Sequence, residues 1–419
     1  MSTIINGLKK DTRYTFLEKI AAHEGFEYNN LINQILKGTV VIPRNNRHDR
    51  LSPIAIGKNT RIKINANIGT SPTHCDFDHE IEKARTAIRS GADTIMDLSI
   101  AGDVSTLRKR IVDELDITLG TVPIYEAMIG LNDPSKLSID HFLKIIERQA
   151  KEKVDFMTIH AGLQKKHIPL LQNRVLGVVS RGGSILVHWM EHHEKENFLY
   201  QYFDKILEIA AEYDITLSLG DGLRPGCTAD ANDDAQFGEL ETLGELVKRS
   251  KDAGVQVIVE GPGHVPIHLI KENIAKQKKI CDGAPFYVLG PLVIDYAAGY
   301  DHIAGAIGGA LAALYGADFL CYVTPAEHLR LPTLDDVREG VIASKIAAAA
   351  VDLANDKSIE KKRNLDISTA RKSFNWDQQE KLAIDTDKFH NYFEKVDCHD
   401  KDITCSMCGD WCAIKRIKK

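Results

Sequence analysis

Strand-like and helix-like segments alternate from residue 60 to residue 355, and no other pattern in the chain limits the choice of fold as strongly. Repeated strand–helix units favour a parallel sheet, and eight such units can close into a barrel. No nucleotide-binding glycine motif opens the first unit, so an open doubly wound sheet is less favoured. The nine strand candidates read RIKINANIG, DTIMDLS, DITLGTVPIY, DFMTIHAG, VLGVVSRGG, ITLSLGDG, VQVIVEGPG, APFYVLGP and FLCYVTP. We predict an α/β fold, a (β/α)8 TIM barrel over residues 60–355, with the ninth candidate as surplus.

Two further regions flank the predicted barrel. Residues 1–59 form a mixed, charged N-terminal extension, and residues 356–419 form a polar, helical arm that ends in a cysteine-rich tail. Polar segments bury little apolar surface of their own, so we expect the position of the arm to depend on docking.

Composition and charge narrow the class of function and the location. A net charge of −6 gives no general attraction to nucleic acid or anionic membranes, and no apolar run reaches the length of a membrane span. The N-terminus lacks the apolar block of a secretory signal. We therefore expect a cytoplasmic protein with no nucleic-acid or membrane partner. Disulfides are rare in the cytoplasm, so clustered thiols there suggest metal or redox chemistry.

Polar and titratable residues gather where the predicted strands end. In a (β/α)8 barrel these ends converge on one pocket, so residues distant in sequence meet around one ligand. A single asparagine or aspartate there can simply cap the next helix, but recurrence at nearly every strand favours a binding site. The candidates are Asn67, Met96, Asp97, Tyr125, His160, Ser180, Arg181, Gly182, Asp221, Gly222, Leu223, Arg224, Glu260, His264, Tyr287 and His328.

Two of these strand ends suggest a phosphorylated ligand. SRGGS, which begins at Ser180, combines a hydroxyl, a guanidinium and flexible backbone N–H groups, although a tight glycine turn could have the same sequence. GDGLRPG repeats the pattern with Asp221 and Arg224. A phosphorylated sugar with free hydroxyls is therefore a reasonable ligand.

A pair of histidines suggests a metal. His264 lies in EGPGHVPIH, and His328 follows the strand candidate FLCYVTP. Two imidazoles with water or substrate could hold a divalent ion, whereas a lone histidine near a helix start is more often structural.

The tail CSMCGDWCAIK contains three cysteines, Cys405, Cys408 and Cys412. Three thiolates at C-x2-C-x3-C spacing can bind a cubic iron–sulfur cluster and leave one iron without a protein ligand. That iron could chelate S-adenosylmethionine, and the cluster could supply the electron that splits it into a 5′-deoxyadenosyl radical. A structural zinc site completed by Cys398 is the competing interpretation, and the spacing alone does not decide between them.

The chain resembles the ThiC family, the non-typical radical S-adenosylmethionine enzymes, from INANIGTS to the end. The resemblance rests on the strings MDLS, GTVPIY, FMTIHAG, SRGGS, SLGDGLRPG, ADANDDAQF, EGPGHVP, GYDHI and CYVTPAEHL, followed by the cysteine tail. It implies a lyase that rearranges 5-aminoimidazole ribotide. It also implies a barrel homodimer. The C-terminal arm of each subunit is expected to deliver the cluster to a barrel mouth, most plainly that of the partner subunit.

The resemblance also implies roles for the candidate residues and names the cofactors. Cys405, Cys408 and Cys412 would hold a [4Fe-4S] cluster, and His264 and His328 a divalent metal, either zinc or iron. S-adenosylmethionine would be the second cofactor, and a flavodoxin-type or ferredoxin-type protein the electron donor. The residues around the ribotide would be Asn67, Met96, Tyr125, His160, Ser180, Arg181, Gly182, Asp221, Gly222, Leu223, Arg224, Glu260 and Tyr287.

Several departures from the family pattern bear on the product. The tail is one residue shorter than the usual C-x2-C-x4-C, SIAGD replaces STGGD, IDYAAGYDHI replaces TDIAPGYDHI, and GIITPEM is absent. These changes alter expected pocket positions at Ile100–Ala101 and Ile294–Ala298. They favour 5-hydroxybenzimidazole, a precursor of the cobalamin lower ligand in anaerobes, over the hydroxymethylpyrimidine phosphate of thiamine. A zinc-stapled barrel hydrolase or aldolase and a silent ribotide-binding paralogue are remoter alternatives.

Overall fold

Eight parallel strands close into a barrel, which confirms the predicted fold. The computed structural model describes residues 3–394, 404–405 and 407–417. The strands follow the order β10–β3–β4–β5–β6–β7–β8–β9, so each pairs with the next along the chain and the last closes on the first. Their bounds are β3 (Lys63–Ile68), β4 (Thr94–Asp97), β5 (Thr118–Thr121), β6 (Phe156–Ile159), β7 (Thr216–Leu219), β8 (Val257–Gly261), β9 (Phe286–Leu289) and β10 (Phe319–Cys321).

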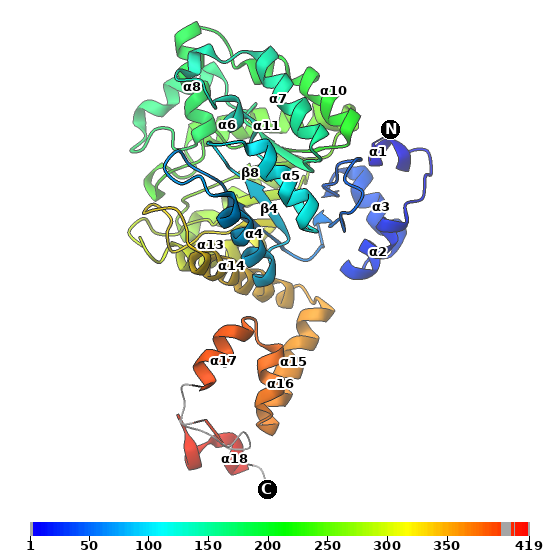
Figure 1. Cartoon of the computed structure of the whole chain (residues 1–419), viewed down its shortest axis with the longest axis vertical. Coiled ribbons are helices and arrows are strands. Elements are labelled where there is room, and N and C mark those ends of the chain that lie inside the picture. Colours follow the sequence, from blue (N-terminus) through cyan, green and yellow to red (C-terminus); the bar gives the residue numbers. More distant parts are fainter. Residues whose placement is uncertain (1–2, 395–403, 406, 418–419) are drawn as a thin grey trace. The chain divides into compact units, whose positions relative to one another are not determined.

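Helices surround the strands (Figure 1). Most of them begin at a side chain that caps the free backbone N–H groups, such as Asp76, Asp103, Ser138 or Asp233. The main helices are α4 (Phe77–Ser90), α5 (Val104–Glu114), α7 (Ile139–Lys151), α8 (Arg181–His193), α10 (Phe203–Tyr213), α11 (Asp234–Asp252), α12 (Ile270–Ile280), α13 (Asp301–Tyr315) and α14 (Leu334–Ala354). The helices cover the outside of the barrel, and nearly all residues of its strands are buried.

One strand prediction is wrong and another needs correction. The run at residues 175–183 is not a strand but part of the connection between β6 and β7, and its last residues begin α8. The Asp230 carboxylate accepts hydrogen bonds from the backbone N–H groups of Val175 and Leu176 at 2.8 and 3.1 Å. A side chain thus takes the place of a neighbouring strand. The ninth candidate, FLCYVTP, supplies β10, so the surplus run is 175–183.

The N-terminal extension has its own apolar core. It contains α1 (Ile4–Leu8), α2 (Thr15–Glu24), α3 (Tyr28–Lys37) and an antiparallel pair, β1 (Val40–Val41) and β2 (Ile56–Gly57). Leu17, Leu31 and Ile35 lie at the centre of this core and are fully buried.

Buried polar contacts join the extension to the amino-terminal ends of the barrel strands. Lys63 Nζ, at the start of β3, lies 2.8 Å from Glu24 Oε1. Asp155, directly before β6, lies 3.0 Å from His48 Nδ1. The extension therefore packs against one end of the barrel and leaves the carboxyl ends of the strands for binding and chemistry.

The contact at Asp214 predicts a pH dependence of stability. Asp214 Oδ2 accepts a hydrogen bond from Ile4 N at 2.9 Å, and burial raises the pKa of this carboxyl group to about 7. An unfolded aspartate titrates near 3.9, so the folded state holds the proton more tightly. This contribution to stability is complete below about pH 4 and is lost as the pH rises through about 7. It amounts to at most about 4 kcal/mol, at roughly 1.4 kcal/mol per pKa unit.

We expect Asp214→Asn, which cannot ionise, to lose less stability than the wild type between pH 5 and pH 8. Urea unfolding at each pH measures the difference. The exposed Asp252→Asn is the matched control and should follow the wild-type curve. Equal losses in the wild type and Asp214→Asn would show that Asp214 titrates normally.

The residues form two compact units, Met1–Ala348 and Ala349–Lys419. The described helices of the second unit are α15 (Ser358–Ser373), α16 (Trp376–Leu382), α17 (Thr386–Glu394) and α18 (Ala413–Ile417). The predicted boundaries at residues 59 and 355 remain sequence-based divisions. None of the described helices combines the length and apolar character that a bilayer crossing needs.

Candidate active site

A cavity lies at the carboxyl ends of the barrel strands. It encloses about 510 Å³, part of it open to solvent. Its lining includes eight of the thirteen residues expected around a ribotide, namely Asn67, Met96, Tyr125, His160, Asp221, Arg224, Glu260 and Tyr287. The barrel topology brings these residues together from seven different strands or the segments that follow them. Their contact with a ribotide remains a prediction.

Packed aromatic rings extend from the cavity into the barrel interior. Tyr287 lines the cavity and stacks on Phe319, with ring centroids 4.3 Å apart. Phe319 meets Phe156 edge-on at 6.3 Å. The interior is therefore filled by side chains, as in other (β/α)8 barrels, and the free space lies at the strand ends.

Charged groups face one another in the cavity wall. Asp221 Oδ1 accepts a hydrogen bond from Arg224 Nη1 at 3.0 Å. Glu260 Oε1 accepts hydrogen bonds from Thr158 Oγ1 and Ser218 Oγ, each at 2.7 Å. Burial and the nearby Asp221 raise the pKa of Glu260 to about 7. A carboxyl group that titrates near neutrality is suited to exchange a proton with a bound ligand.

His160 is a neutral imidazole in the same cavity. Burial and the nearby Arg224 lower its pKa to about 3. The ring is closely packed, since a Cβ atom on Gly182 or Gly220 would come within 2.5 or 2.9 Å of it. Its buried Nδ1 has no hydrogen-bond partner among the described residues. The fixed, neutral ring thus leaves one polar atom of the cavity wall unsatisfied within the described residues.

Amide, phenol and thiol groups form a hydrogen-bonded network in and directly behind the lining. Asn65 Nδ2 donates to Asn67 Oδ1 and to Tyr287 Oη, both at 2.7 Å. Asn67 Nδ2 donates a hydrogen bond to Cys321 Sγ at 3.2 Å. The sequence interpretation missed Asn65 because it lies inside a strand. It missed Cys321 because a cysteine between leucine and tyrosine is typical of an apolar strand.

Tyr125 lies on α6 (Pro123–Ala127), a short helix directly after β5. The Arg181 Cζ atom lies 4.7 Å from the centroid of the Tyr125 ring. A guanidinium at this distance is attracted to the aromatic face. The predicted phosphate-binding arginine is thus placed beside the cavity by a residue of the cavity wall.

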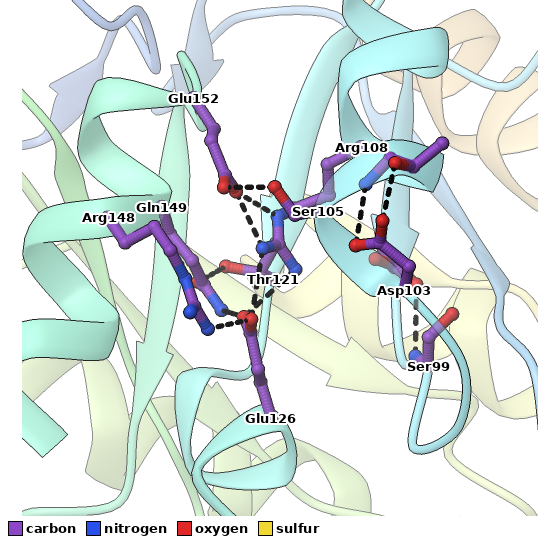
Figure 2. Close-up of polar contacts among 11 residues, drawn as sticks. Ser99, Asp103, Ser105, Arg108, Thr121, Glu126, Arg148, Gln149 and Glu152 are labelled. Atoms are coloured by element: carbon purple, nitrogen blue, oxygen red, sulfur yellow. Dashed lines mark hydrogen bonds and ion pairs between the residues drawn. The ribbon is translucent and has the colours of Figure 1, made fainter. Parts of the chain in front are cut away.

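A buried ion-pair network fixes α6 (Figure 2). Arg108 Nη1, from α5, lies 2.9 Å from Glu126 Oε2, and Arg108 Nη2 lies 2.6 Å from Glu152 Oε2. Arg148 and Gln149, from α7, also donate to Glu126. Since Glu126 follows Tyr125 directly, these contacts hold the part of α6 that carries the cavity residue.

Five of the thirteen predicted residues do not line this cavity, namely Arg181, which lies beside it, and Ser180, Gly182, Gly222 and Leu223. The last four of these belong to the adjoining backbone. Ser180 Oγ accepts a hydrogen bond from Gly183 N at 3.1 Å and so caps α8. A Cβ atom on Gly183 would lie 2.3 Å from the Gly222 oxygen, so the two loops pack backbone to backbone. The glycines allow the loops that carry Arg181 and Arg224 to approach closely.

A second cavity adjoins the first, with about 860 Å³ of free space that is partly open to solvent, and Asn67 and Leu98 line both. Arg181, His328 and Ile100 also line it. The lining also contains two cationic residues that the sequence interpretation missed, Lys83 and Arg330. Lys83 lies inside a predicted helix, and Arg330 lies in the loop that follows the last strand candidate.

The two predicted metal-binding histidines lie side by side, with ring centroids 5.4 Å apart. His264 Nδ1 lies 2.8 Å from Asp295 Oδ1, and His328 Nδ1 lies 3.4 Å from Asp301 Oδ2. A carboxylate partner on Nδ1 is the usual arrangement for a histidine that binds a metal through Nε2. The donor set therefore fits a divalent ion. No three His, Cys, Asp or Glu side chains form a metal-binding group within the described ranges.

The cysteine tail is partly described. Cys405 and Cys408 are exposed, Cys412 is half-buried, and all three are free thiols. Backbone hydrogen bonds run from Cys408 N to Cys405 O at 3.4 Å and from Cys412 N to Gly409 O at 3.2 Å. The described thiols do not converge on one metal-binding group, so the cluster assignment rests on the residue type and the C-x2-C-x3-C spacing. Cys398, the fourth ligand of the competing zinc interpretation, lies outside the described residues.

Comparisons with known proteins agree over almost the whole chain. A family model described as the radical SAM ThiC family matches residues 3–419. A phosphomethylpyrimidine synthase of Methanopyrus kandleri is 51% identical over 409 residues, which cover 96% of this chain and 95% of the relative. A protein of the same name from Archaeoglobus fulgidus is 49% identical over 421 residues, covering 100% and 99%.

Among solved structures, a dihydropteroate synthase of Coxiella burnetii in complex with pteroic acid matches with a TM-score of 0.43 and 12% identity. The match covers 71% of this chain and 96% of that one.

Proposed function

The chain belongs to the radical SAM ThiC family, and from this premise we propose that it is a phosphomethylpyrimidine synthase. It would rearrange 5-aminoimidazole ribotide to 4-amino-5-hydroxymethyl-2-methylpyrimidine phosphate for thiamine biosynthesis. The observation that carries this proposal is the name shared by relatives about half identical over nearly the full length of both chains.

The benzimidazole product, which the sequence departures favour, has no support from these relatives. Of the departing positions, Ile100 lines the second cavity, and Ile294 lies at the surface, 39% exposed. A change at one cavity position is a weaker argument about product than overall identity to relatives of one name. The pyrimidine synthase, which the sequence interpretation gave as the alternative, is therefore the better-supported reading.

We assign the ribotide to the first cavity, with its phosphate toward the adjoining second cavity, whose lining includes Arg181. Arg181, with the capped amino terminus of α8, suits the phosphate, because backbone N–H groups and a guanidinium both favour an anion. Asp221 and Arg224 present an acceptor and donors to ribose hydroxyls. Glu260 would exchange protons with the reacting sugar or base, since its pKa of about 7 lets it serve in either direction.

The cofactors follow from the family and from the donor sets. A [4Fe-4S] cluster with S-adenosylmethionine supplies a 5′-deoxyadenosyl radical when both are bound. Cys405, Cys408 and Cys412 would hold the cluster, and His264 with His328 a divalent metal. A flavodoxin-type or ferredoxin-type protein remains the proposed electron donor.

A homodimer remains part of the proposal. Ile303, Ile307 and Leu314 of α13 are 48%, 46% and 51% exposed, and their spacing places them on one face of the helix. An exposed apolar face of this kind often marks a protein interface. Sedimentation equilibrium should therefore give twice the chain mass, and a monomer at micromolar concentration would contradict the proposal.

Product analysis tests the proposed reaction directly. Anaerobic protein with reconstituted cluster should convert 5-aminoimidazole ribotide, S-adenosylmethionine and dithionite to the pyrimidine phosphate, detected by mass spectrometry. 5-Hydroxybenzimidazole as the main product would favour the other branch of the family. A protein that binds ribotide but forms neither product nor deoxyadenosine under these conditions would be the silent paralogue.

A further inference from the structure

Two charged side chains outside the first cavity bind the backbone of the loop that carries Asp221 and Arg224. Glu239, on α11, accepts hydrogen bonds from Gly222 N to Oε1 at 2.9 Å and from Leu223 N to Oε2 at 2.7 Å. Arg174 Nη2 donates to the Leu223 oxygen at 2.7 Å. Neither residue lines the cavity. The loop is thus held at two N–H groups by a carboxyl group and at one C=O group by a guanidinium.

Both side chains are buried, and each is itself well fixed. Glu239 is 2% exposed, and burial raises the pKa of its carboxyl group to about 8. The Arg174 side chain is 1% exposed and makes two hydrogen bonds to Asp233, at 2.6 and 2.8 Å. A buried carboxylate costs stability unless hydrogen bonds offset the lost hydration. For Glu239, both of these hydrogen bonds come from the Asp221–Arg224 loop of the candidate site.

The loop has little room to adjust. A Cβ atom on Gly222 would lie 3.0 Å from Glu239 Oε1, and the Gly222 oxygen faces the start of α8. A shift of the loop toward either neighbour would therefore produce a clash. The contacts to Glu239 and Arg174 set where Asp221 and Arg224 stand relative to Arg181.

We propose that Glu239 and Arg174 are positioning residues, which hold the Asp221–Arg224 loop in the conformation that binds a phosphorylated sugar. This inference rests on the proposed function, because the ligand is the ribotide. The residues act through the loop backbone and touch no ligand themselves. Neither is among the residues that the sequence resemblance implies.

Calorimetry on the full-length, cluster-loaded protein tests the proposal. Glu239→Gln keeps the shape but replaces one acceptor with a donor that faces a backbone N–H group. We expect about tenfold weaker binding of 5-aminoimidazole ribotide, because one hydrogen bond to the loop is lost and a buried backbone N–H group is left without an acceptor. Binding of S-adenosylmethionine should be unchanged. Glu241→Gln, an exposed change on the same helix, is the control and should bind both ligands as the wild type does.

A double-mutant cycle separates positioning from general damage. If Glu239 acts through Arg224, then Glu239→Gln should cause little further loss of ribotide affinity in an Arg224→Ala background. Additive losses would overturn the proposal. Arg174→Lys, on the other side of the loop, should show the same dependence on Arg224. Failure of both Glu239→Gln and Arg174→Lys to fold would also overturn it, since their role would then be in the fold.

Hydrogen–deuterium exchange distinguishes failure of this inference from failure of the proposed function. The amides of Gly222 and Leu223 should exchange faster in Glu239→Gln, with the rest of the barrel unchanged. Wild-type protein that binds no ribotide, with this local change still present, would reject the ligand and keep the positioning role. Ribotide binding with no exchange difference at residues 222–223 would reject the positioning role alone.

Discussion

Replacing Cys405, Cys408 and Cys412 together with alanine should abolish formation of 5′-deoxyadenosine and leave the anaerobically purified protein colourless. The three thiols are free and exposed or half-buried, and the barrel core in residues 1–348 does not include them. The variant should therefore fold and bind 5-aminoimidazole ribotide as tightly as the wild type. Deoxyadenosine is measured by chromatography after incubation with S-adenosylmethionine and dithionite.

The single replacement Cys75→Ala is the matched control. Cys75 is also an exposed free thiol, but it lies in the barrel unit and apart from the predicted cluster motif. It should keep the iron, the sulfide and the activity of the wild type. Zinc without acid-labile sulfide in the native protein would reject the cluster assignment and restore the zinc interpretation of the tail.

Arg224→Ala should cause the second-largest effect, about a tenfold to hundredfold loss of ribotide affinity. It removes a candidate charge-assisted contact, which is worth about 1.5–3 kcal/mol. It also leaves Asp221 and Glu260 without the cation that faces them in the cavity. Because two uncompensated carboxylates repel each other, we expect the pKa of Glu260 to rise further and thermal stability to fall.

Calorimetry and thermal unfolding measure these two consequences separately. Arg89→Ala is the control, since that arginine is 65% exposed and pairs with Glu82 at the surface. Its removal should cost less than about 1 kcal/mol. Unchanged ribotide affinity in Arg224→Ala would show that Arg224 serves only its ion pair with Asp221.

The strand pattern and the positions at strand ends could be predicted because barrel topology follows from local periodicity. Alternating strands and helices determine which ends converge, so Asn67, Glu260 and Tyr287 meet although long stretches of chain separate them. The error at residues 175–183 has the same origin. A β-branched run predicts a strand until a distant carboxylate, here Asp230, binds its backbone.

The support around the site could not be predicted in the same way. Thr158 and Ser218 lie within strands, where small hydroxyl residues are common, and only the fold shows that both donate to Glu260. Arg108 lies on α5, and Glu126 lies on α6, whose first residues the sequence places at the end of the strand candidate DITLGTVPIY. Their partners become apparent only when α5, α6 and α7 are packed together (Figure 2).

The common wall of the two cavities has a thermodynamic consequence. Asn67 lines both spaces, and its amide is held by Asn65 and Cys321. A ligand in one cavity that hydrogen-bonds to the Asn67 amide changes the hydrogen bonds that this amide can make to a ligand in the other cavity. By linkage, whatever factor the first ligand imposes on the affinity of the second, the second imposes on the first. The binding constant measured for a ligand in one cavity would then depend on whether the other cavity is occupied.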